Sequence, residues 1–265
     1  MKLNLDKQVA IVTGGDSGIG RGICLAYARA GARVVVNYNS SQDKADEVVK
    51  QIEADGGKAV AVQCNVSRED DVERLFDTAI EAFGGVDILV ANSGIQKDAP
   101  FADMSLQDWQ AVIDVNLTGQ FLCARTAIRH FRKQGNRGHG RANGCILFMS
   151  SVHETIPWAG HVNYAASKGG IGMLMRSLAQ EVAGERIRVN SIAPGAIRTA
   201  INEDTTSGDE AKELLKLIPY GRIGATDDVA PLALFMASDL ADYMTGSTVY
   251  VDGGMSLYPG FEDNG

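Results

Sequence analysis

The chain has 265 residues, of which 45% are hydrophobic and 22% are charged. This length and apolar content are sufficient for one large α/β domain or two small ones, each with a buried core. The formal net charge of −8 at pH 7 argues against general binding of nucleic acid or of an anionic membrane.

The cysteines, the histidines and the first residues favour a soluble, cytoplasmic protein. The cysteines are widely spaced, which favours buried free thiols in a reducing compartment over disulfides. They are Cys24, Cys64, Cys123 and Cys145. The four histidines show no metal-ligand spacing, so no metal is expected. Segment 1–6 is not an apolar leader, and no apolar run is long enough to span a bilayer, so no membrane association is expected.

Short apolar runs alternate with helical periodicity along the whole chain. Runs of this kind are typical of parallel strands that are covered on both faces. The expected strands are 9–13, 33–36, 59–63, 87–91, 145–149, 188–193 and 247–251. The expected helices are 19–30, 41–55, 67–83, 105–131, 164–183, 209–217 and 227–237.

Three local features complete this pattern. Ser67-Arg68-Glu69-Asp70 has the spacing of a capping box at the start of a helix. Segment 129–141 is rich in Arg, Gly and His, and we interpret it as a solvated loop, because the chain is acidic and aromatic residues are almost absent there. Segment 197–207 lacks periodicity and is also expected to be a loop.

The alternation predicts one α/β domain over residues 1–265. Its expected architecture is a single-domain, doubly wound (Rossmann-type) parallel sheet of seven strands, with right-handed crossovers. Sheets of this type bind their ligands at the carboxyl ends of the strands. The polar motifs described next all follow predicted strands, so we expect them to share one edge of the sheet.

A glycine-rich turn lies between the first predicted strand and the first predicted helix. Gly14, Gly18 and Gly20 would let the backbone approach a pyrophosphate, and the helix start would supply N–H groups and a positive dipole end. The spacing differs from the Gly-x-Gly-x-x-Gly pattern, and a lone glycine-rich turn is often only a turn. Its place between strand and helix nevertheless favours dinucleotide binding.

Tyr164 and Lys168 form the most informative pair. In a helix they are four residues apart and share a face. A neighbouring ammonium favours the phenolate and lowers the pKa of the tyrosine, which makes Tyr164 a candidate general acid-base. Ser151 ends an apolar run and could present its hydroxyl at the same point. The alternative interpretation is a surface tyrosine beside a solvated lysine.

Taken together, these motifs resemble those of the short-chain dehydrogenase/reductase family over nearly the whole chain. The family pattern Thr-Gly-x-x-x-Gly-x-Gly matches 13–20, and its Asn-Asn/Ala-Ala-Gly motif is present as Asn92-Ser93-Gly94. The family's asparagine, serine, tyrosine, lysine and Pro-Gly motif, and its carboxamide-contacting threonine, match Asn116, Ser151, Tyr164, Lys168, Pro194-Gly195 and Thr199.

This resemblance implies an NAD(P)-dependent oxidoreductase with Tyr164 as its acid-base. Ser151 would orient and polarise the reacting group, Lys168 would bind the nicotinamide ribose and lower the tyrosine pKa, and Asn116 would hold a water. The residues that the resemblance implies at the cofactor are Gly14, Asp16, Ser17, Gly18, Ile19, Gly20, Asn37, Tyr38, Asn39, Ser40, Asn65, Val66, Asn92, Gly94, Tyr164, Lys168, Pro194, Gly195, Ile197 and Thr199.

Segments 150–170 and 252–261 are most similar to bacterial NAD(P)-dependent glucose 1-dehydrogenases, which implies oxidation of D-glucose to D-glucono-1,5-lactone. The implied substrate-binding residues are Ser151, His153, Tyr164 and Arg198. His153 is equally well interpreted as a loop residue that makes only a structural hydrogen bond. Gln96 and Arg198 stand where those enzymes are expected to have an acid and an asparagine, and the 133–143 loop is longer.

Alternative functions stay open at this point. One is a short-chain enzyme that acts on another sugar, polyol or ketone. Another is a non-catalytic dinucleotide-binding regulator, against which the intact Ser151, Tyr164 and Lys168 argue. The resemblance also implies a homotetramer. Helix 164–183 could form its interface or could simply pack against the sheet.

The end of the second predicted strand informs the choice between NAD and NADP. Segment 36–41 has no acid to repel a 2′-phosphate, and no lysine or arginine to bind one. Its asparagines and serines could donate neutral hydrogen bonds. Asp16 weighs mildly against the phosphate, and Asn65 stands where relatives have an adenine-contacting aspartate. We expect both cofactors to be used, with a modest lean to NADP.

Overall fold

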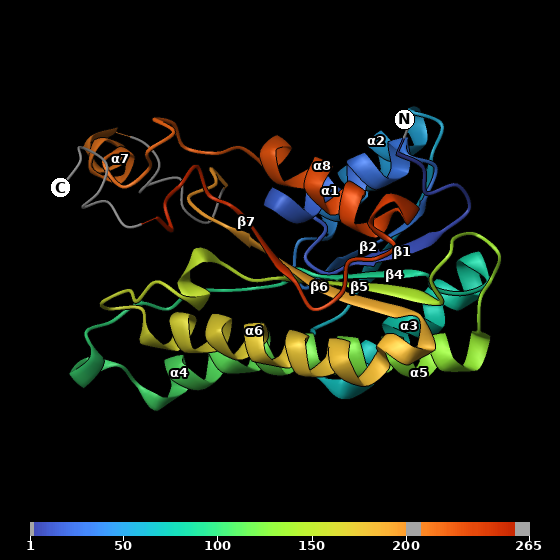
Figure 1. Ribbon diagram of the computed structural model, residues 1–265, viewed down its shortest axis with the longest axis horizontal. Helices are drawn as coiled ribbons and strands as arrows, with labels where there is room; N and C mark the ends of the chain where they lie inside the picture. The colour runs from blue at the N-terminus through green and yellow to red at the C-terminus, as the bar shows by residue number, and fades with distance from the viewer. Residues whose placement is uncertain (1–2, 200–207, 258–265) are drawn as a thin grey trace.

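A parallel sheet organises residues 3–199 and 208–257, which are those that the computed structural model describes. Its strand order is β3-β2-β1-β4-β5-β6-β7, and every neighbouring pair is parallel (Figure 1). The strands are β1 (Val9–Val12), β2 (Arg33–Tyr38), β3 (Lys58–Gln63), β4 (Ile88–Ala91), β5 (Gly144–Met149), β6 (Ile187–Pro194) and β7 (Thr248–Val251). All seven strands were predicted, with ends that differ by at most two residues.

Helices cover both faces of this sheet. The α-helices are α1 (Gly18–Arg29), α2 (Gln42–Ala54), α3 (Glu69–Phe83), α4 (Leu106–Ile113), α5 (Gly119–Gln134), α6 (Val162–Val182), α7 (Gly208–Leu215) and α8 (Thr226–Ala237). Short helical segments are η1 (Phe101–Asp103), η2 (Asp114–Thr118), η3 (Val152–Glu154), η4 (Ala183–Glu185) and η5 (Asp239–Ala241). Helices α1, α2 and α8 pack on one face, and α3, α5 and α6 on the other (Figure 1).

The two-sided cover explains the continuous apolar runs. In β1, Val9 and Ile11 contribute to the core under α3, α5 and α6, whereas Ala10 and Val12 contribute to the core under α1, α2 and α8. All four are fully buried, as successive side chains of a doubly covered strand must be. The strand order reverses between β1 and β4, which is the position where sheets of this kind bind ligands.

The predicted helix 105–131 differs from the observed structure. It consists of α4, the π-helical segment η2 and α5, and α5 continues to Gln134. The prediction of a loop from residue 129 was therefore wrong for 129–134, because arginine, lysine and glutamine are good helix formers. Segment 200–207 of the other predicted loop lies outside the described residues.

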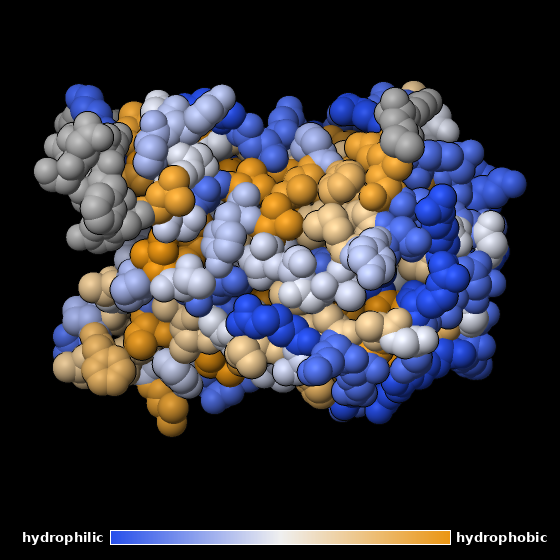
Figure 2. Space-filling model, in the orientation of Figure 1, coloured by the Kyte–Doolittle hydropathy of each residue, from blue (hydrophilic) through white to orange (hydrophobic). Residues whose placement is uncertain are grey.

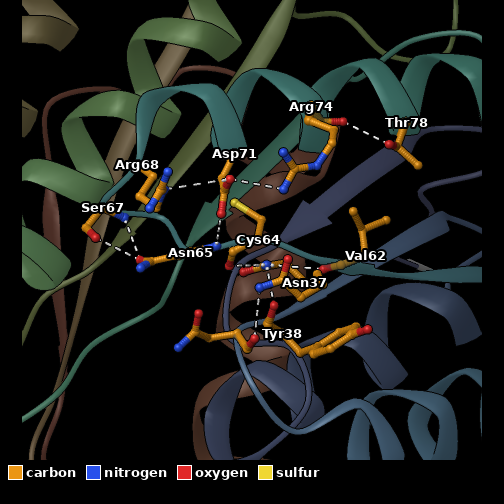
Figure 3. Close-up of polar contacts among 12 residues, drawn as sticks. Asn37, Tyr38, Val62, Cys64, Asn65, Ser67, Arg68, Asp71, Arg74 and Thr78 are labelled. Atoms are coloured by element: carbon orange, nitrogen blue, oxygen red, sulfur yellow. Dashed lines mark hydrogen bonds and ion pairs between the residues drawn. The ribbon is translucent and has the colours of Figure 1, made fainter.

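The capping box predicted at Ser67 is also wrong. Helix α3 begins at Glu69, and the preceding Arg68 makes no side-chain cap. The Ser67 hydroxyl instead donates to Oδ1 of Asn65 at 2.8 Å (Figure 3). The first turn of α3 carries Glu69, Asp70 and Asp71 beside its positive dipole end.

The four cysteines are buried and free, as predicted. None of the described helices has the length and apolar character needed to cross a membrane. Among residues 3–199 and 208–257, no three His, Cys, Asp or Glu side chains gather in a way that could hold a metal ion.

Candidate active site

The glycine turn follows β1 and is held in place by residues that follow β4. The Thr13 hydroxyl accepts hydrogen bonds from the backbone N–H groups of Asn92 and Ser93, at 2.8 and 3.0 Å. The Asn92 side chain donates to the carbonyl oxygens of Thr13 and Gly14, at 2.8 and 3.2 Å. The Asn92 amide is therefore a brace for the turn across the point where the strand order reverses.

Glycine is required in this turn for steric reasons. Gly14 and Gly18 adopt φ values of +59° and +51°, which side chains rarely tolerate. A Cβ at Gly20 would lie 2.1 Å from the carbonyl oxygen of Gly14. The compact turn ends at the start of α1, where the partly exposed residues are Asp16, Ser17, Gly18 and Ile19. An N-terminus of this shape fits the pyrophosphate of a dinucleotide.

Asn37 requires a correction, because its side chain supports the protein instead of facing a ligand. The residue is 1% exposed, and its Oδ1 accepts from the backbone N–H of Gly14 at 3.1 Å. Its amide nitrogen lies 3.0 to 3.3 Å from carbonyl oxygens of Tyr38, Val62 and Cys64 (Figure 3). These bonds use the amide fully, so Asn37 has no donor left for an adenosine 2′-phosphate.

Asn39 and Ser40 are exposed just beyond β2, and Ser41 after them is partly exposed. Asn65, at the end of β3, uses its side-chain oxygen for the backbone N–H and hydroxyl of Ser67. The backbone N–H of Asn65 donates to Asp71, and this bond lowers the pKa of that carboxyl (Figure 3). Ser67 and Asp71 therefore both fix the position of Asn65.

The segment after β6 passes close to the glycine turn. The Gly195 N–H donates to the carbonyl oxygen of Val251 at 3.0 Å, and a Cβ there would lie 2.8 Å from Cα of Asp252. Pro194 is the last residue of β6, and Ile197 is buried. Thr199 lies beside the start of α1, since a Cβ at Gly18 would be 3.3 Å from its methyl group. The glycine turn and segment 194–199, both predicted to bind the cofactor, thus lie next to each other.

Ser151, Tyr164 and Lys168 converge at the carboxyl end of β5. Ser151 lies two residues beyond the end of the strand, and its hydroxyl accepts from the backbone N–H of His153 at 3.2 Å. Tyr164 and Lys168 lie in α6, and the Lys168 ammonium is 5.3 Å from the centroid of the Tyr164 ring. Lys168 is 3% exposed and donates to the carbonyl oxygen of Met149 at 2.8 Å. The shared helix face predicted for this pair is confirmed.

The expected effect of Lys168 on the tyrosine pKa is not what the structure shows. Burial raises the pKa of Tyr164, and hydrogen bonds with the side chains of Ser151 and Gln96 act in the opposite direction. Burial also lowers the pKa of Lys168 to about 8. The ammonium lies over the ring and donates to the Met149 carbonyl, and burial is the largest influence on the pKa of the phenol.

Asn116 lies in the π-helical segment η2 and is fully buried. Its Oδ1 accepts from the backbone N–H of Ile95 at 2.8 Å, and its amide donates to the carbonyl oxygen of the same residue at 3.0 Å. The amide also lies 3.2 Å from the Ser167 hydroxyl. A π-helical turn commonly marks a functional position in a helix. Here it presents Asn116 to the segment that follows β4.

Comparisons with known proteins agree with this geometry. A family model described as enoyl-(acyl carrier protein) reductase matches residues 14–256. The chain is 47% identical to 3beta-hydroxysteroid dehydrogenase 1 of Eggerthella lenta, over 98% of this chain and 97% of that one. It is 45% identical to glucose 1-dehydrogenase 2 of Bacillus subtilis, over 98% of each.

A solved structure is similar over the same extent. This is a 7α-hydroxysteroid dehydrogenase in complex with NADH and 7-oxo-glycochenodeoxycholic acid. It superposes with a TM-score of 0.88 and 35% identity, covering 95% of both chains. The chain belongs to the short-chain dehydrogenase/reductase family. As an oxidoreductase of this family it uses NAD or NADP.

Beside the short-chain dehydrogenase tyrosine lies a column of stacked rings. Trp158 stacks on His153 at 4.2 Å and on His161 at 3.5 Å between ring centroids. Both His153 and Trp158 approach Tyr164 edge-on, at 6.3 and 6.2 Å. Nδ1 of His153 lies 3.1 Å from the carbonyl oxygen of Ile156, so this histidine does make a structural hydrogen bond.

Several supporting residues were missed by sequence reasoning. Asn163 is fully buried, and it donates to the carbonyl oxygen of Lys97 at 2.8 Å. Glu154 accepts from the hydroxyls of Ser150 and Tyr250, at 2.6 and 3.0 Å. The spacing of Ser150 and Glu154 is the only signal that could have indicated this bond.

Arg198, which was predicted to face the substrate, is exposed, and its backbone N–H donates to the carbonyl oxygen of Gly224.

Proposed function

We propose that this enzyme transfers a hydride between NAD(P) and a sugar, and that it oxidises D-glucose to D-glucono-1,5-lactone. The observation that carries the proposal is the convergence of Ser151, Tyr164 and Lys168 at the carboxyl end of β5, beside a turn built for a dinucleotide. The sugar is supported by the similarity to the Bacillus subtilis glucose 1-dehydrogenase 2.

The chain's own residues supply binding, orientation and the proton. The start of α1 would hold the pyrophosphate, and Gly94, Lys168 and Thr199 would border the nicotinamide end. The cofactor, when bound, accepts or gives the hydride. Tyr164 would take the proton of the substrate hydroxyl while Ser151 fixes the substrate oxygen. Lys168 would turn from Met149 toward the ribose and bring its positive charge to the phenol.

We propose that both cofactors are accepted, with a modest lean to NADP. Asn39 and Ser40 are accessible at the end of β2, and neutral hydrogen bonds of this kind contribute about 0.5–1.5 kcal/mol each. Burial raises the pKa of Asp16, and the carboxylate in the glycine turn weighs mildly against a phosphate. The ratio of kcat/KM values for the two cofactors at one sugar concentration tests this. A preference for NAD of about a hundredfold would contradict it.

A substrate panel tests the reaction. Glucose, other aldoses, polyols, hydroxysteroids and simple secondary alcohols would be compared by the absorbance of the reduced nicotinamide, in both directions. We expect glucose to give the largest kcat/KM. Inert sugars together with turnover of a hydroxysteroid or another ketone would overturn the glucose assignment but leave the reaction class intact. No turnover of any compound would favour the non-catalytic regulator.

A hydroxysteroid is the second candidate substrate, on one specific observation. The relative named 3beta-hydroxysteroid dehydrogenase 1 is 47% identical to this chain, which is similar to the identity with the glucose enzyme. The panel above distinguishes the two candidates directly.

We further propose a cytoplasmic homotetramer. Four buried free thiols fit a reducing compartment. Phe101 and Leu106 are each 78% exposed, and Figure 2 shows apolar surface at the edge where α4 lies. An exposed apolar patch of this kind is a common subunit contact. Helix α6 buries Ile171, Met175 and Ala179 against the sheet, so simple packing accounts for that face. Light scattering of the purified protein tests the tetramer.

A further inference from the structure

One carboxylate connects the end of β5 with the edge strand of the sheet. The backbone N–H of Glu154 donates to the carbonyl oxygen of Ser151 at 3.0 Å, within the short helical segment η3. The Glu154 carboxylate accepts from the hydroxyl of Ser150 at 2.6 Å and from the hydroxyl of Tyr250 at 3.0 Å. Ser150 directly precedes Ser151, and Tyr250 lies in β7, which is the last strand of the sheet. Glu154 therefore joins the catalytic serine to β7.

Helix α6 lies close to the same carboxylate. Ser150 is 3% exposed, and its hydroxyl oxygen is 3.5 Å from the carbonyl oxygen of Lys168. A hydroxyl has one proton to donate, and Glu154 is the nearer acceptor. A Cβ at Gly172 would lie 3.4 Å from Oε2 of Glu154 and 3.5 Å from Nη2 of Arg176. The end of β5, β7 and α6 thus meet at this carboxylate.

Strand β7 continues the connection toward the predicted cofactor segment. Val251 follows Tyr250, and its carbonyl oxygen accepts from the backbone N–H of Gly195 at 3.0 Å. Burial raises the pKa of Tyr250, so its hydroxyl keeps its proton at neutral pH and donates to Glu154. Ser151 and Gly195 are therefore both fastened to β7, the first through Glu154 and the second directly.

We propose that Glu154 is a positioning residue, which holds Ser151 and the Lys168 turn of α6 in register through Ser150 and Tyr250. A hydroxyl that donates to a carboxylate at 2.6 Å makes a short, charge-assisted bond, about twice as strong as a neutral one. Glu154 acts on the reaction through its neighbours and not by binding the substrate. This inference deepens the proposed function, on which it rests for the reaction that is measured.

The charge of Glu154 also acts on Lys168. Burial lowers the pKa of that ammonium to about 8, and the negative charge of Glu154 opposes this shift. From α6, the ring of Tyr164 faces the ammonium, with its centroid at 5.3 Å. A Cβ at Gly94 would lie 3.8 Å from Nζ of Lys168 and 3.5 Å from Oδ1 of Asn116, so the segment after β4 and η2 contribute neutral groups there.

The first experiment measures kcat and KM of Glu154→Leu and Glu154→Gln with the best substrate of the panel. Leucine removes both acceptors, so kcat should fall about tenfold as Ser151 and Lys168 lose their common support, while KM changes less than about twofold. Glutamine can accept from one hydroxyl and donate to the other, so kcat at pH 7 should return to within about threefold of the wild type. Glu181→Gln is the matched control, since Glu181 is an exposed glutamate of α6. A wild-type kcat in Glu154→Leu would overturn the proposal.

A double-mutant cycle tests whether Glu154 and Tyr250 act as one unit. Tyr250→Phe alone should lower kcat about twofold to fivefold, because it removes one of the two bonds to the carboxylate. In the Glu154→Leu background it should add less than about twofold, since its partner is already gone. Effects that multiply in full would contradict the proposal. If Glu154→Leu does not fold, a wild-type kcat in Tyr250→Phe would contradict it instead.

The pH dependence of cofactor affinity is a readout that a merely structural role would not change. Lys168 is expected to bind the nicotinamide ribose as an ammonium, and without the Glu154 charge it should lose its proton at a lower pH. NADH affinity, measured by fluorescence titration, should be equal in Glu154→Gln and the wild type at about pH 6. At about pH 9 the variant should bind about threefold to tenfold more weakly. Arg176 is retained in both proteins. An affinity ratio that is the same at both pH values would overturn the role of the charge.

Failure of the proposed function gives a different pattern of results. If no compound of the panel is turned over, the hydride-transfer proposal fails, and the NADH titration still decides on Glu154. If Lys168→Ala binds NADH with wild-type affinity, the ribose role of Lys168 fails, and the cycle of kcat values decides on Glu154.

Discussion

Burial favours the neutral form of both members of the Tyr164–Lys168 pair. It raises the pKa of the phenol and lowers that of the ammonium to about 8. The carboxylate of Glu154 opposes the second shift, because its negative charge favours the protonated lysine. A bound nicotinamide ribose would replace the Met149 carbonyl as the partner of Lys168. With a pKa of about 8, Lys168 stays mostly protonated at pH 7, so the pair consists of a neutral phenol and an ammonium.

At the scale of single residues, Tyr164→Phe tests the acid-base role. The change removes one oxygen and keeps the ring that packs against His153 and Trp158. We expect kcat to fall about 10²–10⁴-fold, which is the usual contribution of a general acid-base, with nearly unchanged cofactor affinity. Steady-state kinetics and a cofactor titration check both parts. A variant that keeps more than about a tenth of the wild-type rate would exclude Tyr164 as the acid-base.

At the scale of elements, the end of β2 contains two asparagines with different tasks. Asn37 joins the glycine turn to β2 and β3, whereas Asn39 is exposed one residue beyond the strand. Asn37→Ala leaves the N–H of Gly14 and several carbonyl groups without their partner. We expect the free energy of unfolding to fall by about 2–3 kcal/mol, since each buried unpaired group costs about 1–3 kcal/mol.

Substitutions of Asn37 and Asn39 should separate an effect on stability from an effect on the preference between NAD and NADP. Asn37→Ala should weaken the binding of NAD and NADP to the same extent, because the turn that holds their shared pyrophosphate is loosened. Asn39→Ala should keep the stability and change the ratio of the two affinities. Urea unfolding and cofactor titrations of both variants check this. If Asn37→Ala changed the ratio of the two cofactor affinities and kept the wild-type stability, Asn37 would have to be a cofactor-binding residue.

The connection between α5 and β5 closes the amino end of the sheet. Arg137 donates to the carboxylate of Asp87 at 2.7 Å, and their side chains are 14% and 13% exposed. Asp87 also accepts from the backbone N–H of Val9, at the start of β1. Arg137 in this long loop thus supplies the cation that pairs with Asp87 at the amino end of the sheet, whereas Tyr164 lies at the carboxyl end.

Arg137→Ala measures the contribution of this loop. Breaking a buried ion pair typically costs about 3–5 kcal/mol, and partial exposure reduces this to about 2–3 kcal/mol here. Arg129→Ala is the matched control, because its pair with Glu73 is 4.0 Å long and about half exposed. We expect the control to change stability by less than about 1 kcal/mol. Equal losses in the two variants would show that the loop does not support the sheet.

The elements that sequence predicted well are those whose signal is local. Apolar runs mark strands that are covered on both faces, and 3.6-residue periodicity marks the helices between them. Asn37 was misinterpreted because a polar residue at a strand end has the same local pattern as a ligand-binding residue, and most of its hydrogen-bond partners lie outside β2. Ser67 was misinterpreted because α3 begins at Glu69, which makes Arg68 and not Ser67 the residue that precedes the helix. The π-helical turn at Asn116 leaves almost no trace in the apolar pattern.

At the scale of the whole molecule, the response to acid can be predicted from the described carboxylates. Hydrogen bonds with Arg222 and with a backbone N–H lower the pKa of Asp228 to about 2. The pKa values of Asp71, Asp108 and Glu185 are lowered in the same way. A carboxyl with a lowered pKa stabilises the fold above its unfolded pKa of about 4, and this contribution is lost as pH falls through the folded value.

Stability should therefore decrease steadily from about pH 4.5 to about pH 2. Burial raises the pKa of Asp87, and that residue contributes with the opposite sign. Urea midpoints measured over this range check the expectation, with Asp228→Asn as the test variant. This variant should be less stable than the wild type at pH 7, and the difference should shrink at pH 2. A difference that is independent of pH would rule out the Asp228 carboxylate as a source of acid sensitivity.

The reversal of strand order between β1 and β4 has a consequence for protein synthesis. Strands β1, β2 and β3 leave the ribosome first and can pair with one another, but β1 then lacks its other neighbour. The amide of Asn92, which braces Thr13 and Gly14, follows β4 and arrives later. Thr199 is made later still. A nascent chain can thus acquire β1, β2 and β3 without a usable cofactor site, and tight NAD(P) binding would require synthesis to have passed Thr199.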